Sequence, residues 1–338
     1  MLYRTAVLGA GNIARFHLEA MKSLPDIRAC AIADVQKRRA DRLAAEYGLS
    51  SYTDYKDMIV REKPDLVVVT LPHYLHAEAA KFAAERGIHI LLEKPMALNV
   101  RECDGIIAAA KAGGVRVMVG HTQHYMAENL EAKAWIDSGR LGRLVMIGDT
   151  RHQQYDLPGR PDWFFEHSKA GGGILTNLGS HCIDKIQWLT GGRITRVKAV
   201  VDYTPTRGDV ESGGCALLET SAGVPATLGV SGHPGGVVDE TELRFTGGSL
   251  KLRTGSGLWI GEGKEYRKLP VPPQPDPFVR QLEDLLGAIR EDREPECSMA
   301  YSRSVVAAVQ SLYLSSERGA EIEVEQAAGS EDARHARR

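Results

Sequence analysis

The sequence predicts an α/β protein of two domains: a doubly wound parallel sheet, followed by a second domain with a mainly antiparallel sheet. Over the first 120 residues, short apolar runs alternate with helical patterns, which is typical of a parallel sheet covered by helices. From about residue 143, successive strands are joined by glycine-rich or short polar turns, which favour hairpins. At 338 residues, the chain is long enough for both domains.

In the first part of the chain, the apolar runs are rich in Val, Ile and Leu and too continuous for a half-exposed sheet. They predict buried strands at about 4–9, 28–34, 65–72, 88–93 and 115–120. Helices are expected between them, at about 13–24, 38–47, 77–86 and 99–112. Pro25 and Gly48 end the first two helices, as residues that stop a helix do.

The sequence GAGNIA (9–14) stands directly between the first strand and its helix. Gly9 permits a tight turn, and Gly11 lets the backbone approach a pyrophosphate. Asn12 and Ile13 then begin the helix, whose amide-rich N-terminus would bind the phosphates. The position of the motif predicts a dinucleotide site of the Rossmann type, with a plain structural turn as the alternative.

Asp34 ends the second strand, where a carboxylate binds the adenosine ribose hydroxyls in such sites. Its charge would repel a ribose 2′-phosphate, which favours NAD. Lys37, Arg38 and Arg39 follow within one helical turn and could reach such a phosphate, although charged clusters there are usually solvated surface. We therefore expect NAD as the cofactor, and NADP is not excluded.

Lys94 follows Glu93 at the end of the strand expected at 88–93. Ligands of open α/β sheets bind outside the carboxyl ends of strands, so Lys94 should project toward the nicotinamide end of the cleft. Pro95 stiffens the turn. A lysine here can hydrogen-bond a substrate hydroxyl and stabilise an alkoxide as the hydride leaves. An ordinary surface lysine is the alternative.

A helix near 128–138 opens the second part of the chain, and a proline-rich segment at 270–277 leads into the last helices. The pattern therefore predicts a dinucleotide-binding domain over 1–120, a substrate-binding domain over 121–324 and a disordered polar tail over 325–338. Strands of the second domain are expected at 143–154, 194–204, 214–221, 224–231, 241–246, 248–253, 257–261 and 265–269.

Three glycines (171–173) precede a helix with two stripes. At about 100° per residue, one stripe is apolar and the other contains Asn177, His181, Asp184 and Trp188. By periodicity alone the second stripe is expected in solvent. A tryptophan is unusual there, however, and the glycines allow another segment or a cofactor to approach closely.

Four segments resemble the glucose–fructose oxidoreductase / inositol dehydrogenase (Gfo/Idh/MocA) family in order and spacing. They are VLGAGNIARFH (7–17), DLVVVTLPHYLHAEAA (65–80), GIHILLEKPMALN (87–99) and GGGILTNLGSHCID (171–184). The resemblance implies an N-terminal Rossmann domain and a C-terminal α/β domain with an open, mainly antiparallel sheet. It also implies NAD(P)-linked oxidation or reduction at a carbinol of a sugar, cyclitol or sugar-acid-like polyol, in a homodimer or homotetramer.

By the same resemblance, Lys94 matches the active-site lysine and His181 the histidine acid/base. Asn177 stands where the best-known members have aspartate, so amide geometry is kept and charge is lost. We expect His181 to accept the hydroxyl proton, Lys94 to bind the reacting oxygen and Asn177 to orient the substrate or His181. The resemblance also assigns cofactor contacts to Leu71, His73 and His76. We expect Glu93 to contact the cofactor as well.

Two loops supply candidate substrate contacts. Residues 120–125 carry a histidine near the family's usual arginine position, and 151–167 carries aromatic rings suited to a polyol and arginines suited to a carboxylate. Each candidate could equally be an ordinary loop or core residue. The candidates are His124, Arg151, Tyr155, Arg160 and Trp163. The histidines lack the spacing of a metal motif, so no metal site is expected.

Composition narrows the classes of function. Lys and Arg number 42 and Asp and Glu 44, a balance that argues against nucleic acid as a partner. No apolar run approaches the roughly 20 residues of a membrane span, and we expect no signal peptide, because the first residues already lead into a strand and a glycine turn. Five scattered cysteines without C-x-x-C indicate reduced thiols and a cytoplasmic location.

The sequence therefore predicts an NAD(P)-dependent dehydrogenase or reductase acting on CH–OH groups. Two alternatives stay open. One is a non-catalytic dinucleotide-binding regulator on the same fold, against which the retention of both Lys94 and His181 argues. The other is an enzyme that uses tightly bound NAD transiently, without net redox change.

Overall fold

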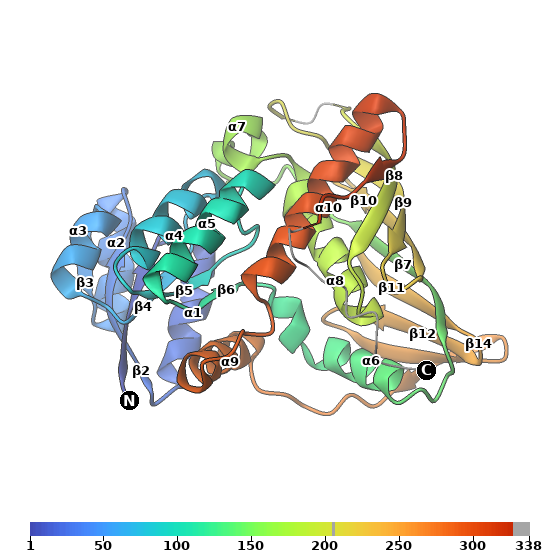
Figure 1. The fold of residues 1–338 in the computed structure, drawn as a ribbon, viewed down its shortest axis with the longest axis horizontal. Helices are drawn as coiled ribbons and strands as arrows, with labels where there is room; N and C mark the ends of the chain where they lie inside the picture. The colour runs from blue at the N-terminus through green and yellow to red at the C-terminus, as the bar shows by residue number, and fades with distance from the viewer. Residues whose placement is uncertain (205–206, 327–338) are drawn as a thin grey trace. The chain divides into compact units, whose positions relative to one another are not determined.

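The computed structural model describes residues 1–204 and 207–326, and the chain forms two compact units (Figure 1). The first unit contains Met1–Tyr125 and Gln274–Ser302. The second contains Met126–Pro273 and the chain from Arg303 onward. Most of the tail expected at 325–338 lies outside the described residues.

The first unit is built on a six-stranded parallel sheet, as predicted, in the order β3-β2-β1-β4-β5-β6. The order reverses between β1 and β4, which is the switch point beside which such sheets bind ligands. The strands are β1 (Tyr3–Leu8), β2 (Ile27–Ala33), β3 (Ser50–Tyr52), β4 (Leu66–Val69), β5 (His89–Leu92) and β6 (Val117–Val119). The helices along this part are α1 (Asn12–Lys22), α2 (Lys37–Tyr47), α3 (Tyr55–Glu62), α4 (His76–Ala84) and α5 (Val100–Gly113).

Strand β3 and helix α3 were not predicted. β3 has three residues, none of them fully buried, so no apolar run reveals it. The side chain of Asp54 caps α3 by accepting hydrogen bonds from the backbone N–H groups of Lys56 and Asp57. The pair adds one edge strand without changing the predicted architecture.

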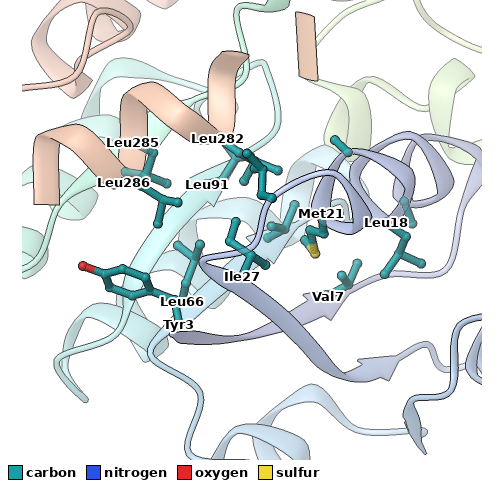
Figure 2. Close-up of a cluster of buried hydrophobic side chains, with 14 of the residues drawn as sticks. Tyr3, Val7, Leu18, Met21, Ile27, Leu66, Leu91, Leu282, Leu285 and Leu286 are labelled. Carbon is teal, nitrogen blue, oxygen red and sulfur yellow. The ribbon is translucent and has the colours of Figure 1, made fainter. Parts of the chain in front are cut away.

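Helix α9 (Pro277–Glu291) belongs to the first unit, although the strands of the second unit precede it in the chain. Its Leu282, Leu285 and Leu286 are buried and belong to the cluster that includes Tyr3 and Leu66 (Figure 2). These leucines form one apolar face at helical spacing. The cofactor unit is therefore discontinuous in sequence, which the predicted boundaries at 120 and 324 did not anticipate.

The second unit is built on a nine-stranded sheet in the order β14-β13-β12-β11-β7-β10-β9-β8-β15. Between the described strands, β7 and β10 pair in parallel and the other neighbours are antiparallel, so the predicted mainly antiparallel sheet is confirmed. The strands are β7 (Leu144–His152), β8 (Ile194–Asp202), β9 (Gly213–Thr220), β10 (Pro225–Ser231), β11 (Val238–Phe245), β12 (Gly248–Arg253), β13 (Gly257–Glu262), β14 (Glu265–Leu269) and β15 (Ile322–Glu323).

The helices that accompany this sheet are α6 (Ala127–Asp137), α7 (His167–Ala170), α8 (Ser180–Thr190) and α10 (Met299–Arg318). Alternate residues of β8 and β9 are buried, whereas Val200 and Leu217 on the other side are exposed. Ser315 and Ser316 of α10 accept hydrogen bonds from backbone N–H groups of β8 and so hold α10 to this strand. Within the described ranges, no helix is both long and apolar enough to cross a membrane.

Candidate active site

The turn after β1 requires its first glycine. Gly9 has φ +102°, a conformation that side chains rarely adopt. A Cβ there would lie 2.7 Å from the carbonyl oxygen of Thr70, which follows β4. The N–H of Gly9 donates to the carbonyl of Ala33 at 2.7 Å. Gly9 therefore lets the ends of β1 and β4 meet at the switch point.

The helix that follows leaves its N-terminus open for an anion. Gly11 is the N-cap of α1, whose described first turn has neither a side-chain cap nor an acidic residue. A Cβ on Gly11 would meet no atom within 4 Å. The first N–H groups of a helix lack intrahelical partners, so those at Asn12 and Ile13 can bind phosphate oxygens. This open cradle fits a dinucleotide pyrophosphate.

Asp34 lies beside this turn and is fixed by two backbone groups. Its Oδ2 accepts from the N–H of Ala10 at 2.9 Å, and its Oδ1 accepts from the N–H of Gln36 at 2.8 Å. Each carboxylate oxygen retains a further lone pair, so both can still accept from ribose hydroxyls. Lys37, a candidate for binding a 2′-phosphate, instead forms an ion pair with Asp41 at 2.8 Å. Both features favour NAD.

Replacing Asp34 by alanine is expected to weaken NAD binding by about 10- to 100-fold, because charge-assisted hydrogen bonds to the ribose are lost. Binding of NADP should change less, because the repulsion of its 2′-phosphate disappears. Calorimetric titration with each dinucleotide measures both constants. Asp57→Ala, at an exposed carboxylate paired with Arg61, is the control. An unchanged ratio of NAD to NADP affinity would remove Asp34 from cofactor selection.

Glu93 is an internal support of the loop that carries Lys94. Its Oε1 lies 2.8 Å from Nε2 of the fully buried His17 on α1, and its Oε2 accepts weakly from the N–H of Lys94 at 3.3 Å. Burial raises the pKa of Glu93, but the hydrogen bond and charge of His17 outweigh it and lower the pKa below its usual value. Glu93 thus joins helix α1 to the end of β5.

The loop after β4 is held by a second buried histidine. The two ring nitrogens of His76 lie 2.8 Å from the carbonyl oxygens of Leu71 and Pro95. Burial lowers the pKa of His76, against the carbonyl contacts, which raise it. His73 is also buried and contacts the ring of His76. His76 therefore fixes the loops after β4 and β5 to each other, while its predicted cofactor contact stays a prediction.

In the second unit, the glycines before α8 admit segments of the chain itself. Gly172 has φ +145°, and a Cβ there would lie 2.1 Å from the hydroxyl oxygen of Tyr313. A Cβ on Gly173 would lie 2.2 Å from the carbonyl oxygen of Glu211. The Glu211 carboxylate accepts from the N–H groups of Gly173 and Leu175 at 2.6 and 2.8 Å. The predicted close approach is therefore made, in this unit, by Glu211 and Tyr313.

The predicted helix begins as one π-helical turn, η4 (Leu175–Gly179), and continues as α8. Such turns are frequent at functional sites. Asn177 lies in the π turn with 9% of its surface exposed, and Asp184 is fully buried. His181, in the first turn of α8, is half-buried. The solvent-exposed face suggested by periodicity is therefore absent from this described helix, because neighbouring segments cover it.

Two of the predicted substrate residues, Tyr155 and Arg160, lie near Asn177. Tyr155 is 1% exposed and packs against the ring of Phe165. Burial raises the pKa of Tyr155 to about 12, while the Arg160 charge and a hydrogen-bonding interaction with Asn177 oppose that shift. Trp163, on the same loop, stacks on Phe164 with ring centroids 3.8 Å apart. Tyr155, Arg160 and Asn177 thus form a cluster within the second unit.

The other two substrate candidates have partners elsewhere. Arg151 pairs with Asp239 at 3.3 Å. His124 is 2% exposed in the first unit, where its Nδ1 lies 3.4 Å from Glu296 and its ring contacts Tyr301. Their roles toward substrate stay predictions.

A buried charge cluster next to the site was missed from the sequence. Lys185 is 1% exposed, and its Nζ lies 3.1 Å from Asp149, 3.0 Å from Asp239 and 3.3 Å from the hydroxyl of Thr254. Burial lowers the pKa of Lys185, but the two aspartates outweigh it and raise the pKa. The only sequence signal is the strand alternation, which places Asp149 on the same face as the buried Ile147. The cluster anchors α8 one turn beyond His181.

Glu211→Gln is expected to lower the free energy of unfolding by about 1–3 kcal/mol, because an amide oxygen cannot accept both N–H groups. Burial raises the pKa of Glu211, against its backbone hydrogen bonds. The native state therefore binds the Glu211 proton more tightly than the unfolded chain, in which a glutamate has a pKa of about 4.3. Relative to the variant, the wild type should lose stability as the pH rises from about 4.3 through the raised pKa of the native state. Urea unfolding of both proteins across that window tests this, and parallel pH profiles would contradict it.

No group of three or more His, Cys, Asp or Glu side chains in the described part of the chain could hold a metal ion. All five cysteines are free thiols.

Two family models match the chain. Residues 3–121 match "Oxidoreductase family, NAD-binding Rossmann fold", and residues 129–251 match "GFO/IDH/MocA C-terminal domain". The first match confirms the predicted Rossmann domain and the expectation of NAD as the cofactor. The second match covers the segment that carries Tyr155, Asn177 and His181.

Individual proteins are similar over most of the chain. A dTDP-3,4-didehydro-2,6-dideoxy-alpha-D-glucose 3-reductase from Actinomadura kijaniata is 29% identical, over 86% of this chain and 89% of that protein. A levoglucosan dehydrogenase from Pseudarthrobacter phenanthrenivorans is 30% identical, over 72% of this chain but only 65% of its own length. The crystal structure of an aldose-aldose oxidoreductase from Caulobacter crescentus, complexed with glycerol, matches with a TM-score of 0.88 at 24% identity. That match covers 96% of this chain and 100% of that one, and it shows the fold.

Proposed function

Because the chain belongs to the Gfo/Idh/MocA family and is an NAD(P)-dependent oxidoreductase, we propose that it transfers a hydride between NAD and a carbinol of a small polyol. The class proposed is a sugar, a cyclitol or a sugar-acid-like polyol. Relatives named as a levoglucosan dehydrogenase and a dTDP-sugar 3-reductase support a sugar-type substrate.

The observation that carries the proposal is the turn after β1. An open helix N-terminus, a glycine that allows close approach and a carboxylate fixed by Ala10 and Gln36 lie together at the switch point. Gly9, Gly11 and Asp34 would hold the dinucleotide there. NAD, when bound, supplies the nicotinamide carbon that accepts the hydride.

The chain's own residues would handle the hydroxyl proton. We assign its removal to the His181 imidazole, as general base, because His181 follows the π turn that carries Asn177. We assign to the Lys94 ammonium a hydrogen bond to the reacting oxygen, which stabilises the alkoxide. Asn177 would orient the substrate through its amide. Because this amide is neutral, the hydroxyl proton would pass between the substrate and His181 only.

The test is NADH formation at 340 nm with a panel of sugars, cyclitols and sugar acids. Oxidation of at least one compound, with one NADH formed per product, is expected. If NAD binds but no compound reacts in either direction, a non-catalytic regulator is favoured. If product forms without net NADH, transient use of bound NAD is favoured instead.

Two properties of the protein as a whole are proposed with this function. The exposed Val200 and Leu217 on one face of the second sheet support a homodimer or homotetramer. Five free cysteines agree with a reducing, cytoplasmic location. Light scattering of the purified protein measures its oligomeric state.

A further inference from the structure

Arg160 is held between two aromatic rings in the loop between β7 and α7. Its guanidinium carbon lies 4.3 Å from the centroid of the Tyr155 ring and 5.1 Å from that of Phe164. Tyr155 is itself buried and fixed, because its N–H donates to the carbonyl of Gly232 at 2.8 Å. Stacking of this kind orients a guanidinium while leaving the N–H donors at its edge available.

The charge of Arg160 is not neutralised by the surrounding loop. Asp156 and Asp162, its acidic neighbours in sequence, both form ion pairs with Arg207. Glu166, the next carboxylate along the chain, pairs with Lys169 at 2.7 Å. Among the described residues, Arg160 has no carboxylate within ion-pair distance. Arg151, by contrast, already pairs with Asp239.

Arg160 also lies near Asn177. Its guanidinium lies over the ring of Tyr155, and the Asn177 side chain lies near the hydroxyl of the same tyrosine. A half-buried arginine without a carboxylate partner in the described chain matches a ligand that brings one negative charge. Two carboxylate oxygens fit the guanidinium edge as a pair of parallel hydrogen bonds.

We propose that Arg160 binds a carboxylate of the substrate, so that the substrate class is polyhydroxy acids, such as aldonates or uronates, rather than neutral polyols. The inference rests on the proposed hydride transfer and narrows its substrate. A carboxylate matches the single uncompensated charge of the site, whereas a phosphate ester carries about 1.5 to 2 negative charges. Asn177 is neutral and would not repel such an acid.

The experiment compares acids with neutral partners of the same configuration. D-Gluconate is paired with D-glucitol, and D-glucuronate with D-glucose, within a panel of such pairs, and glucose 6-phosphate represents phosphate esters. In the wild type, kcat/KM for the better acid should exceed that of its neutral partner by about 10-fold or more. Arg160→Gln should lower that value by about 10- to 100-fold, mainly through KM, and change the neutral partner by less than about 3-fold. Arg160→Lys should restore part of the loss.

Arg267→Gln is the matched control, because Arg267 is an exposed arginine paired with Glu262 on a sheet-edge hairpin. This variant should change kcat/KM neither for the acid nor for its neutral partner. Equal losses for acid and neutral compounds in Arg160→Gln would overturn the inference, as would a wild type that prefers the neutral polyol or the phosphate ester. Calorimetric measurement of acid binding distinguishes failure of this inference from failure of the proposed hydride transfer. Acid binding that Arg160→Gln abolishes would uphold the inference even without turnover. Binding of no acid, or equal binding by the variant, would overturn it.

Discussion

Replacing His181 by alanine is expected to lower kcat by about 10²- to 10⁴-fold, because the substrate hydroxyl loses its general base. Lys94→Ala should have an effect of similar size, because the alkoxide loses its cationic hydrogen-bond donor. Neither change touches the β1 turn or Asp34, so NAD affinity should stay within about 3-fold of wild type. Stopped-flow measurement of NADH formation gives the rate, and calorimetry gives the NAD affinity.

His233→Ala and Lys264→Ala are the matched controls. His233 is partly buried between β10 and β11, where it pairs with Asp202, and Lys264 is exposed on the turn between β13 and β14. They should retain wild-type kcat. Near-normal turnover in either His181→Ala or Lys94→Ala would remove that residue from the proposed chemistry. Weak NAD binding by a variant would show instead that its fold or cofactor site has been damaged.

Lys185→Met is expected to lower the free energy of unfolding by about 3–5 kcal/mol, because it leaves Asp149 buried without its cation. Methionine is close to lysine in shape, so the lost charge rather than a cavity carries the effect. The raised pKa of Lys185 means that its contribution is fully present below the unfolded lysine pKa of about 10.4 and is lost as pH rises through the folded pKa. The loss in Lys185→Met should therefore be constant from pH 6 to 9, as measured by urea unfolding.

Two comparisons make this result specific. Lys37→Met breaks an exposed pair and should cost less than about 1 kcal/mol. Adding Asp149→Asn to Lys185→Met should recover part of the stability, because a buried amide is less costly than a buried, unpaired carboxylate. A loss below about 1 kcal/mol in Lys185→Met would show that Asp149 is protonated or reaches solvent.

The geometry of the turn after β1 was predictable from local sequence, because Gly9, Gly11 and Asp34 lie at strand and helix ends that are close to one another along the chain. Their contacts to the cofactor stay predictions. The glycines before α8 were harder to interpret. They predicted a close approach, but Glu211 and Tyr313 come from distant segments, and a single sequence does not show which residues tertiary folding brings together.

The periodicity of α8 failed for a related reason. A stripe containing Asn177, His181 and Asp184 has the pattern of a wet face when the helix is considered alone. The structure instead buries Asn177 and Asp184, and Tyr155 supplies a polar neighbour to Asn177. Polar residues on a helix therefore predict solvent only where no polar partner faces them.

The return of α9 to the first unit has a consequence for synthesis of the protein. Leu282, Leu285 and Leu286 complete the core around Tyr3 and Leu66, so that core has an uncovered apolar surface until residue 291 has been made. During translation, the strands of the second unit leave the ribosome before α9 does. The cofactor-binding unit, although it begins the chain, is therefore expected to be among the last parts to reach its final stability.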